Sequence, residues 1–280
     1  MATSKSKENL VFDHRTLRLI VGCIAFSFSW IVFLLATTIT SSISSSYHTD
    51  ARDVFVGFLF VIGVLLIAYK GHEYQVAPGN HGKFWRRVRR YWAKHEEDIV
   101  STIGGVAAIA AAVCPTACDS CTRDLRANVH TIAAIILFAI VVYFCLVAFL
   151  RSAYAKTAEG KDAEFRFWRV VKYALQNGEA NADITAKSRI RIYLFCGVGI
   201  ALVMVGLFVA EFTVLDETRT AFKLTYWAET IALFLFGIAW MVASQFQFIR
   251  KLRLLWKLRR RRMNHLAGQA AQPVRFFSRD

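Results

Sequence analysis

Six apolar runs alternate with polar segments along the whole chain. They cover roughly residues 17–39, 53–69, 99–116, 129–150, 190–212 and 226–248. A helix rises about 1.5 Å per residue, so each run is long enough to cross a hydrocarbon core of about 30 Å, the second and third only just. The pattern therefore predicts an all-α, polytopic membrane protein with six transmembrane helices in a single bundle.

Composition agrees with this prediction. Of the 280 residues, 56% are hydrophobic, and the mean hydropathy is +0.39. A soluble domain of this size would have to bury more apolar side chains than one core can hold. We therefore expect a six-span transmembrane domain over residues 1–250, followed by a basic cytoplasmic tail over residues 251–280.

The basic residues alternate from one polar segment to the next, and this sets the predicted orientation. Thirty of the 35 Lys and Arg residues lie in segments 1–18, 70–98, 151–191 and 250–280. Short cytoplasmic loops carry an excess of Lys and Arg, so both termini are predicted to be cytoplasmic. We expect an integral protein of a plasma or inner membrane.

The formal charge of +15 raises the question of a nucleic-acid partner. The basic residues, however, lie in short stretches beside apolar spans, where attraction to anionic cytoplasmic phospholipid accounts for them. We therefore expect membrane lipids, and no nucleic acid, as partners.

Three basic segments have helical amphipathic patterns: 83–94, 163–175 and 250–264. In 163–175, Phe165, Trp168, Val171 and Leu175 form an apolar stripe between basic residues. We expect cytoplasmic helices at the membrane surface, which act either as unspecific anchors or as recognition sites for one anionic lipid. The arginines expected to contact lipid are Arg86, Arg87, Arg89, Arg90, Arg166, Arg169, Arg259, Arg260, Arg261 and Arg262.

The third apolar run is rich in small residues. Gly104, Gly105 and a series of alanines would allow neighbouring backbones to approach closely. We predict that this helix is central and the least exposed to lipid.

Ionisable residues gather at the predicted outer ends of the spans, where a charge near lipid is costly unless it is paired, hydrated or functional. One group precedes the second span, one residue lies in the first turn of the fourth span, and one lies at a similar depth in the sixth. The candidates for an outer polar pocket are His48, Asp50, Arg52, Asp53, His130 and Glu229.

Four of these side chains have the chemistry of zinc ligands, namely His48, Asp53, His130 and Glu229. A zinc-bound water could hydrolyse an ester or amide. No HxxxH or HExxH spacing places two ligands on one helix face. Three interpretations stay open: helix capping and helix-dipole roles, a pocket without metal, and a zinc centre.

Three cysteines, Cys114, Cys118 and Cys121, lie close together at the outer end of the third span. A disulfide of Cys118 or Cys121 with a neighbour, free thiols and a metal site are the alternatives. Cys23, Cys145 and Cys196 lie within apolar runs and are interpreted as packing residues.

Three motifs occur in a recognisable order: SISSSYHTDARDVFVG before the second span, VHTIAAIILF in the fourth, and YWAETIALFLFG in the sixth. In this order the chain resembles the six-span membrane family of damage-regulated autophagy modulators and FGF-receptor-activating proteins. The matching positions are Ile43, Ser44, Phe55, Gly57, His130 and Glu229, with Asp53 in place of the usual acidic residue. The chain departs from the family at Ser45, where the family has Asp, and at Ala51-Arg52-Asp53, where it has a Pro-Glu element.

The resemblance implies a non-enzymatic role in lipid or membrane homeostasis. The outer pocket would bind a lipid headgroup or a small cation, and a homo-oligomer or a membrane-protein partner would be consistent with this role. One alternative is a membrane-embedded metal-dependent lipid hydrolase, similar to the alkaline-ceramidase and progestin-receptor-like superfamily. Another is an oligomeric ion pore or membrane effector, for which Ser27, Ser29, Thr37, Thr38 and Thr40 are the polar residues of the first span.

Overall fold

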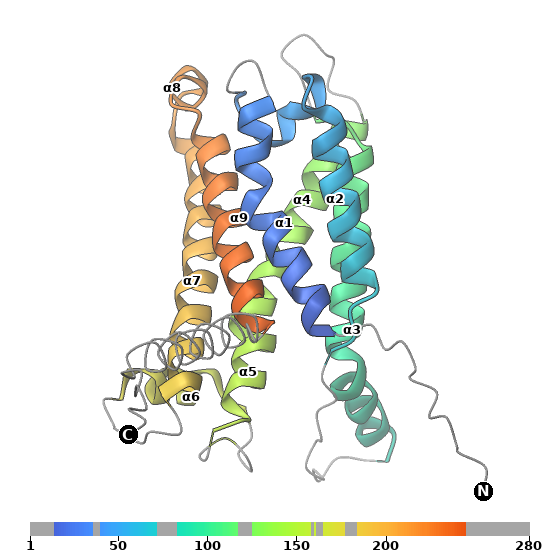
Figure 1. Cartoon of the computed structure of the whole chain (residues 1–280), viewed down its shortest axis with the longest axis vertical. Helices are drawn as coiled ribbons and strands as arrows, with labels where there is room; N and C mark the ends of the chain where they lie inside the picture. Colours follow the sequence, from blue (N-terminus) through green and yellow to red (C-terminus); the bar gives the residue numbers. More distant parts are fainter. Residues whose placement is uncertain are drawn as a thin grey trace, which may run out of the picture. The chain divides into compact units, whose positions relative to one another are not determined.

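The computed structural model describes residues 14–35, 40–71, 83–116, 125–157, 160, 165–176 and 184–244. Within these residues the regular structure is entirely helical, which confirms the all-α prediction (Figure 1). The elements are α1 (His14–Leu35), the 3₁₀ turn η1 (Ser44–His48), α2 (Arg52–Ile67), α3 (Lys83–Val113), α4 (Leu125–Tyr143), the π turn η2 (Phe144–Ala148), α5 (Phe149–Tyr154), α6 (Phe167–Leu175), α7 (Ile184–Thr213), α8 (Asp216–Ala221) and α9 (Leu224–Ala243).

Four stretches of the described residues are long and apolar enough to cross a membrane, which corrects the predicted number of six. They are Thr16–Leu35, Leu125–Tyr154, Ala186–Thr213 and Leu224–Ala243. The helix α2 has only 16 residues, whereas a span needs about 20. The apolar part of α3 begins directly after the acidic residues Glu96, Glu97 and Asp98, which shortens the uncharged stretch.

The long helices form a closed ring of neighbours. Starting from α1, each helix packs on the next in the order α2, α3, α4, α7 and α9, and α9 returns to α1. In Figure 1, α2 and α3 lie side by side, while α7 and α9 form another pair. The π turn and α5 continue α4, and both α5 and α6 contact α7. This ring places residues from α1, α2, α3, α4 and α9 around one interior.

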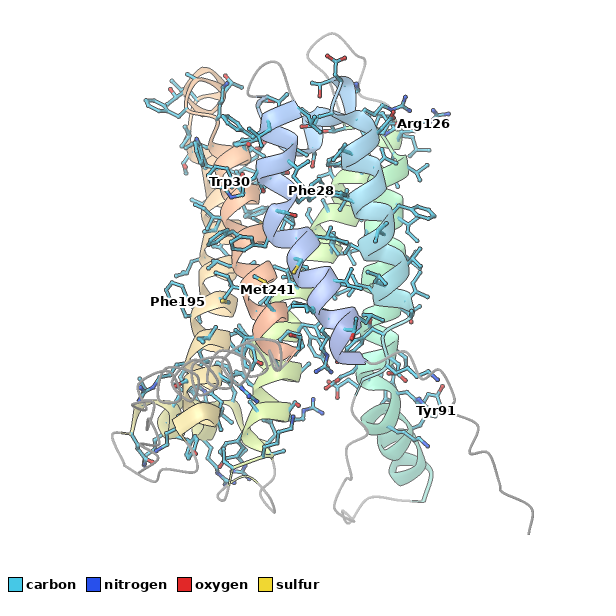
Figure 2. All side chains as sticks on the ribbon, viewed as in Figure 1. Phe28, Trp30, Tyr91, Arg126, Phe195 and Met241 are labelled. Atoms are coloured by element: carbon cyan, nitrogen blue, oxygen red, sulfur yellow. The ribbon has the colours of Figure 1, made fainter. Side chains whose placement is uncertain are left out.

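The outward faces of the ring carry large apolar side chains. Trp30 is 58% exposed and Phe195 is 71% exposed, and Figure 2 shows Phe195 pointing away from the bundle. A water-soluble monomer rarely exposes so much contiguous apolar surface. These faces are what a lipid environment would cover.

Glycines allow α2 and α3 to approach at their backbones. A Cβ atom added to Gly105 would lie 2.5 Å from the Gly63 carbonyl oxygen and 3.0 Å from the Ile67 nitrogen. The prediction of small-residue packing by the third helix is therefore confirmed. Its predicted central position is wrong, because Ile103 and Val106 on another face of α3 are about half exposed. A helix within a ring keeps an outer face.

Replacement of Gly105 by Val should destabilise the bundle. The new side chain would meet backbone atoms of α2 that cannot rotate away, so we expect the free energy of unfolding to fall by about 1–3 kcal/mol. Gly206→Val in α7 is the matched control, since nothing lies within 4 Å of a Cβ at that position. Thermal unfolding of the two variants in the same detergent measures the difference, and equal melting temperatures would contradict the packing described here.

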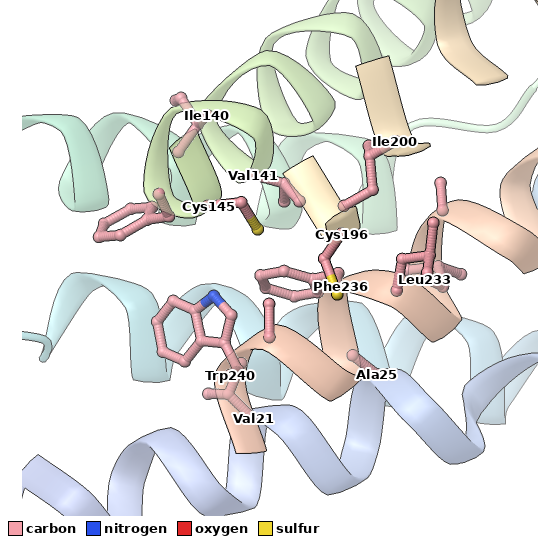
Figure 3. Packing of buried hydrophobic residues seen from close by; sticks show 14 of the residues in the cluster. Val21, Ala25, Ile140, Val141, Cys145, Cys196, Ile200, Leu233, Phe236 and Trp240 are labelled. Atoms are coloured by element: carbon pink, nitrogen blue, oxygen red, sulfur yellow. The ribbon is translucent and has the colours of Figure 1, made fainter. Parts of the chain in front are cut away.

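Aromatic side chains fill the interior around Trp240, which has no exposed surface. The rings of Tyr69, Phe144, Phe149 and Phe236 lie with centroids 5.5–5.6 Å from that of Trp240. Figure 3 shows Cys145 and Cys196 in the same packed region, and both are fully buried. Their predicted role as packing residues is confirmed, whereas Cys23 is exposed on the outer face of α1.

The predicted amphipathic helices differ from the structure in their bounds. Residues 83–94 are not a separate interfacial helix, because α3 runs without interruption from Lys83 to Val113. The side chains of Arg86, Arg87, Arg89 and Arg90 are outside the described residues. The tail 251–280, which includes Arg259, Arg260, Arg261 and Arg262, is also outside the described residues. So are Thr37 and Thr38 of the first span.

Helix α6 is amphipathic, as predicted, but it has two apolar faces. Val170, Tyr173 and Ala174 are buried, and the helix packs on α7. Trp168 and Leu175, from the predicted stripe, are 79% and 73% exposed. Arg166 and Arg169 are also exposed, so their contact with lipid stays a prediction.

Candidate functional site

A cavity of about 40 Å³ lies inside the ring of helices, where side chains from α1, α2, α3, α4 and α9 meet the turn η1. One ordered water needs about 10–15 Å³ on this measure, so there is room for a few water molecules or one small ion. Its polar lining residues are Ser44, His130 and Glu229, its aromatic ones are Phe28, Phe55 and Phe138, and the rest are aliphatic.

Glu229 lies in the second turn of α9 and holds the turn η1 in place. Its Oε2 atom accepts hydrogen bonds from the backbone nitrogens of Ile43, at 2.6 Å, and Ser44, at 3.4 Å. Its Oε1 atom accepts a third from the Ser44 hydroxyl at 3.1 Å. A carboxylate has about four acceptor positions, so these donors leave it able to bind a further donor or cation.

No Lys or Arg side chain in the described part of the chain lies within ion-pair distance of Glu229. The carboxylate is partly buried and lines the cavity. A charge removed from water is costly unless an opposite charge or a set of hydrogen bonds offsets that cost. The neutral donors offset part of it, and a cation in the cavity would offset the remainder.

His130 lies in the second turn of α4 and is only 4% exposed. Its Nδ1 atom is 2.9 Å from the Ala111 carbonyl oxygen and 3.0 Å from that of Cys114. Two carbonyl acceptors require that Nδ1 carries the proton, so neutral His130 has an unprotonated Nε2 atom. That Nε2 atom is buried and has no hydrogen-bond partner among the described residues.

His130 and Glu229 both cap helical elements, but not the helices on which they lie. His130 donates to carbonyls at the end of α3, which lack partners within their own helix. Glu229 accepts from amides at the start of η1. Each side chain therefore stabilises the end of an element other than its own, and each also lines the cavity.

The other predicted pocket residues do not line the cavity. The Nε2 atom of His48 is 2.9 Å from the Thr116 carbonyl oxygen. The guanidinium of Arg52 donates to the Tyr47 hydroxyl at 3.2 Å and lies over its ring. Asp50 and Asp53 also lie outside the lining, and the start of α2 has no side-chain cap.

The predicted set of four zinc ligands is not assembled. Among the described residues there is no group of three or more His, Cys, Asp and Glu side chains that could hold a metal ion. The reason is geometric, because His130 and Glu229 line the cavity, whereas the His48 ring is hydrogen-bonded to the Thr116 carbonyl in the loop after α3. Cys114 has a free thiol, and Cys118 and Cys121 are outside the described residues.

A second polar cluster lies at the other end of α9, and the sequence analysis missed it. Arg18 donates to the Tyr69 hydroxyl at 2.6 Å and to the carbonyl of Ala243 at 3.4 Å. Tyr69 in turn donates to Glu97 Oε2 at 3.4 Å. Tyr69 follows α2 and lies outside the four candidate spans; burial raises the pKa of its hydroxyl, and the nearby Arg18 opposes that shift.

The acidic sequence Glu96-Glu97-Asp98 was the signal for this cluster, because it interrupts an otherwise basic segment. Glu96 accepts two hydrogen bonds from Arg151 Nη2, at 3.1 and 3.2 Å, and one from the Tyr143 hydroxyl at 2.7 Å. The neighbouring Asp98 accepts from the backbone nitrogen of Gly71 at 2.6 Å. These contacts connect α3 to α4, α5 and the segment after α2.

Comparison with known proteins identifies no relative, since no protein family, no curated protein and no solved structure matches this chain.

Proposed function

We propose that this protein is a multi-pass membrane protein that binds a small cation in the cavity lined by Glu229 and His130. One observation carries the proposal. Glu229, whose carboxylate has no Lys or Arg partner in the described part of the chain, and His130, whose buried Nε2 atom has no hydrogen-bond partner there, both line this small cavity.

The size of the cavity favours a small cation over a complete lipid headgroup. Pockets for drug-sized ligands have about 300–1,000 Å³, whereas this cavity has about 40 Å³. A monatomic cation, an ammonium ion or the terminal group of a larger molecule would fit. Of the two ligand classes expected from the sequence, a small cation is therefore favoured, and a lipid headgroup could enter only with a small cationic end group.

The hydrolase alternative has less support from the lining residues. Catalytic zinc sites use three protein ligands and a water molecule. Only His130 and Glu229 among the lining side chains are of the ligand types found there. We therefore propose binding without catalysis.

Membrane context follows from the charge pattern and the four long apolar helices. We propose that both termini are cytoplasmic, that exposed Arg166 and Arg169 contact anionic phospholipid, and that the protein acts in lipid or membrane homeostasis. The basic residues of segments 1–18, 151–191 and 250–280 support the orientation. The role itself rests on the resemblance to the six-span family and stays a prediction.

Glu229→Gln tests the cation site. At a chloride concentration ten times the dissociation constant, a bound cation should stabilise the wild-type protein by about 1.4 kcal/mol. The variant should lose this gain, because its neutral amide cannot offset a cationic charge. The measurement is the melting temperature of purified protein in Na⁺, K⁺ and NH₄⁺ chloride, compared with the bulky tetraethylammonium chloride, which has no N–H donor, at equal ionic strength.

Asp53→Asn is the matched control, because Asp53 is an exposed carboxylate in the first turn of α2 that does not line the cavity. It should respond to cations as the wild type does. The proposal fails if no small cation stabilises the wild type more than tetraethylammonium does, or if Glu229→Gln keeps the full response.

A further inference from the structure

We infer that the cation bound in this cavity is an ammonium group, either free or at the end of a primary amine. The inference rests on the proposed function, since it specifies which cation the Glu229 site takes. It starts from the acceptors and rings that line the cavity.

The polar lining of the cavity has free acceptors and no free donor. His130 uses its Nδ1 proton on two carbonyl oxygens, which leaves the Nε2 lone pair unpaired. The Ser44 hydroxyl and backbone nitrogen both donate to Glu229. A ligand in this cavity must therefore donate hydrogen bonds, and an ammonium group carries up to four N–H donors together with a positive charge.

An imidazole nitrogen distinguishes ammonium from the alkali and alkaline-earth cations. Hard cations prefer oxygen ligands, and their sites are built from carboxylate, carbonyl and water oxygens. Here one acceptor is a nitrogen lone pair, which accepts an N–H donor as readily as an oxygen does. Zinc also binds imidazole nitrogen but needs more ligands than the two side chains that line this cavity.

Three aromatic rings complete the lining: Phe28, Phe55 and Phe138. Phe28 and Phe55 have ring centroids 5.8 Å apart, and Phe55 is stacked on His130 at 6.4 Å. Aromatic faces attract ligand cations through the ring quadrupole, and substituted ammonium groups are typical partners. A site with one carboxylate and several rings thus suits a cation that tolerates a wall of low polarity, such as an ammonium group.

The size and hydrogen-bond pattern of the cavity also set an upper limit on the ligand. Quaternary ammonium has no N–H donor, so it could not satisfy His130 Nε2, and a bulky one would not fit a cavity that holds only a few water molecules. Ammonium, methylammonium and the primary amine of an ethanolamine headgroup meet both conditions. All three carry a positive charge and N–H donors, and they differ only in whether the ammonium group is a free ion or part of a lipid.

The first experiment compares ions on purified, delipidated protein. Half-saturation concentrations are read from the rise in melting temperature with NH₄⁺, methylammonium, K⁺, Na⁺, Zn²⁺ and tetramethylammonium chlorides. We expect ammonium and methylammonium to saturate at concentrations at least tenfold below K⁺ and Na⁺, and tetramethylammonium to have no effect. Glu229→Gln should abolish the ammonium response.

Phe138→Leu supplies a second variant that does not depend on Glu229. It keeps every hydrogen-bonding group, so the protein should still bind cations, but the ratio of K⁺ to ammonium half-saturation concentrations should fall at least threefold. Equal or tighter binding of K⁺, Na⁺ or Zn²⁺ by the wild type would overturn the ammonium inference and leave the proposed cation site standing. A lack of response to all small cations would instead overturn the proposed function.

A second experiment separates the two sources of the ammonium group. Protein reconstituted in vesicles of phosphatidylethanolamine and phosphatidylcholine is extracted, and its bound lipids are identified by native mass spectrometry. Enrichment of phosphatidylethanolamine in the wild type, lost in Glu229→Gln, supports the lipid amine. Equal lipid occupancy in both proteins, with ammonium binding retained in the wild type, supports the free ion.

Discussion

Arg18→Met should lower the free energy of unfolding by about 3–5 kcal/mol, the cost expected when one member of a buried charge network is removed. Arg18 is 7% exposed and Glu97 is 3% exposed, and Tyr69 connects them. Methionine keeps much of the side-chain length but removes the positive charge. The Glu97 carboxylate then stays buried beside Tyr69 without the guanidinium charge. Titration with a denaturing detergent measures the change.

Two comparisons isolate the charge effect in this cluster. Arg166→Met removes an exposed guanidinium and should change the unfolding free energy by less than about 0.5 kcal/mol. Adding Glu97→Gln to Arg18→Met should recover part of the loss, because the remaining group is then neutral. If the double variant is less stable than the single one by the full cost of Glu97→Gln alone, the two charges are not coupled.

Trp240→Ala should cost about 3–5 kcal/mol, because it empties the centre of the aromatic cluster. In lipid, the apolar side chain gains nothing from leaving water, so the loss comes from van der Waals contacts that no other atoms replace. Four rings contact Trp240 with nearly equal spacing. Phe149 lies on α5 and Phe236 on α9, so the empty space left by Trp240 would weaken the packing of both helices.

Trp30→Ala is the control for this prediction, since Trp30 is 58% exposed on α1. Detergent or lipid can fill the space that it leaves, so the unfolding free energy should change by less than about 1 kcal/mol. The melting temperatures of the two variants in one detergent give the comparison. Similar losses in both variants would contradict the described difference in burial.

The sequence predicted the long helices well because an uninterrupted apolar run has few alternatives in lipid. The predicted 190–212 and 226–248 correspond to α7 and α9. The predicted 53–69 also matches α2 within two residues at each end. The start of α3 was predicted less well, since a run of apolar residues does not reveal where a helix begins. The helix α3 extends into the basic residues from Lys83, so its charged and apolar parts are a single element.

The site was predicted in part, and the reason differs from residue to residue. His130 and Glu229 were identified because ionisable residues in apolar helices are rare. His48 has the same chemistry, but its ring contacts the carbonyl of Thr116 in the loop after α3. The sequence does not show in which direction a side chain points. Phe28, Phe55 and Phe138 look like ordinary core residues in sequence. Arg18 resembles the other basic residues near a span, and only the fold brings it to Tyr69.

The π turn Phe144–Ala148 has a consequence for sequence alignment. A π turn accommodates one residue more than an α turn, so everything after it is rotated by about 100° relative to a continuous α-helix. His130 precedes this extra residue and Arg151 follows it. Relatives that have residues equivalent to His130 and Arg151 but no π turn should show a one-residue gap within 144–148. An ungapped alignment would pair Arg151 with the wrong position.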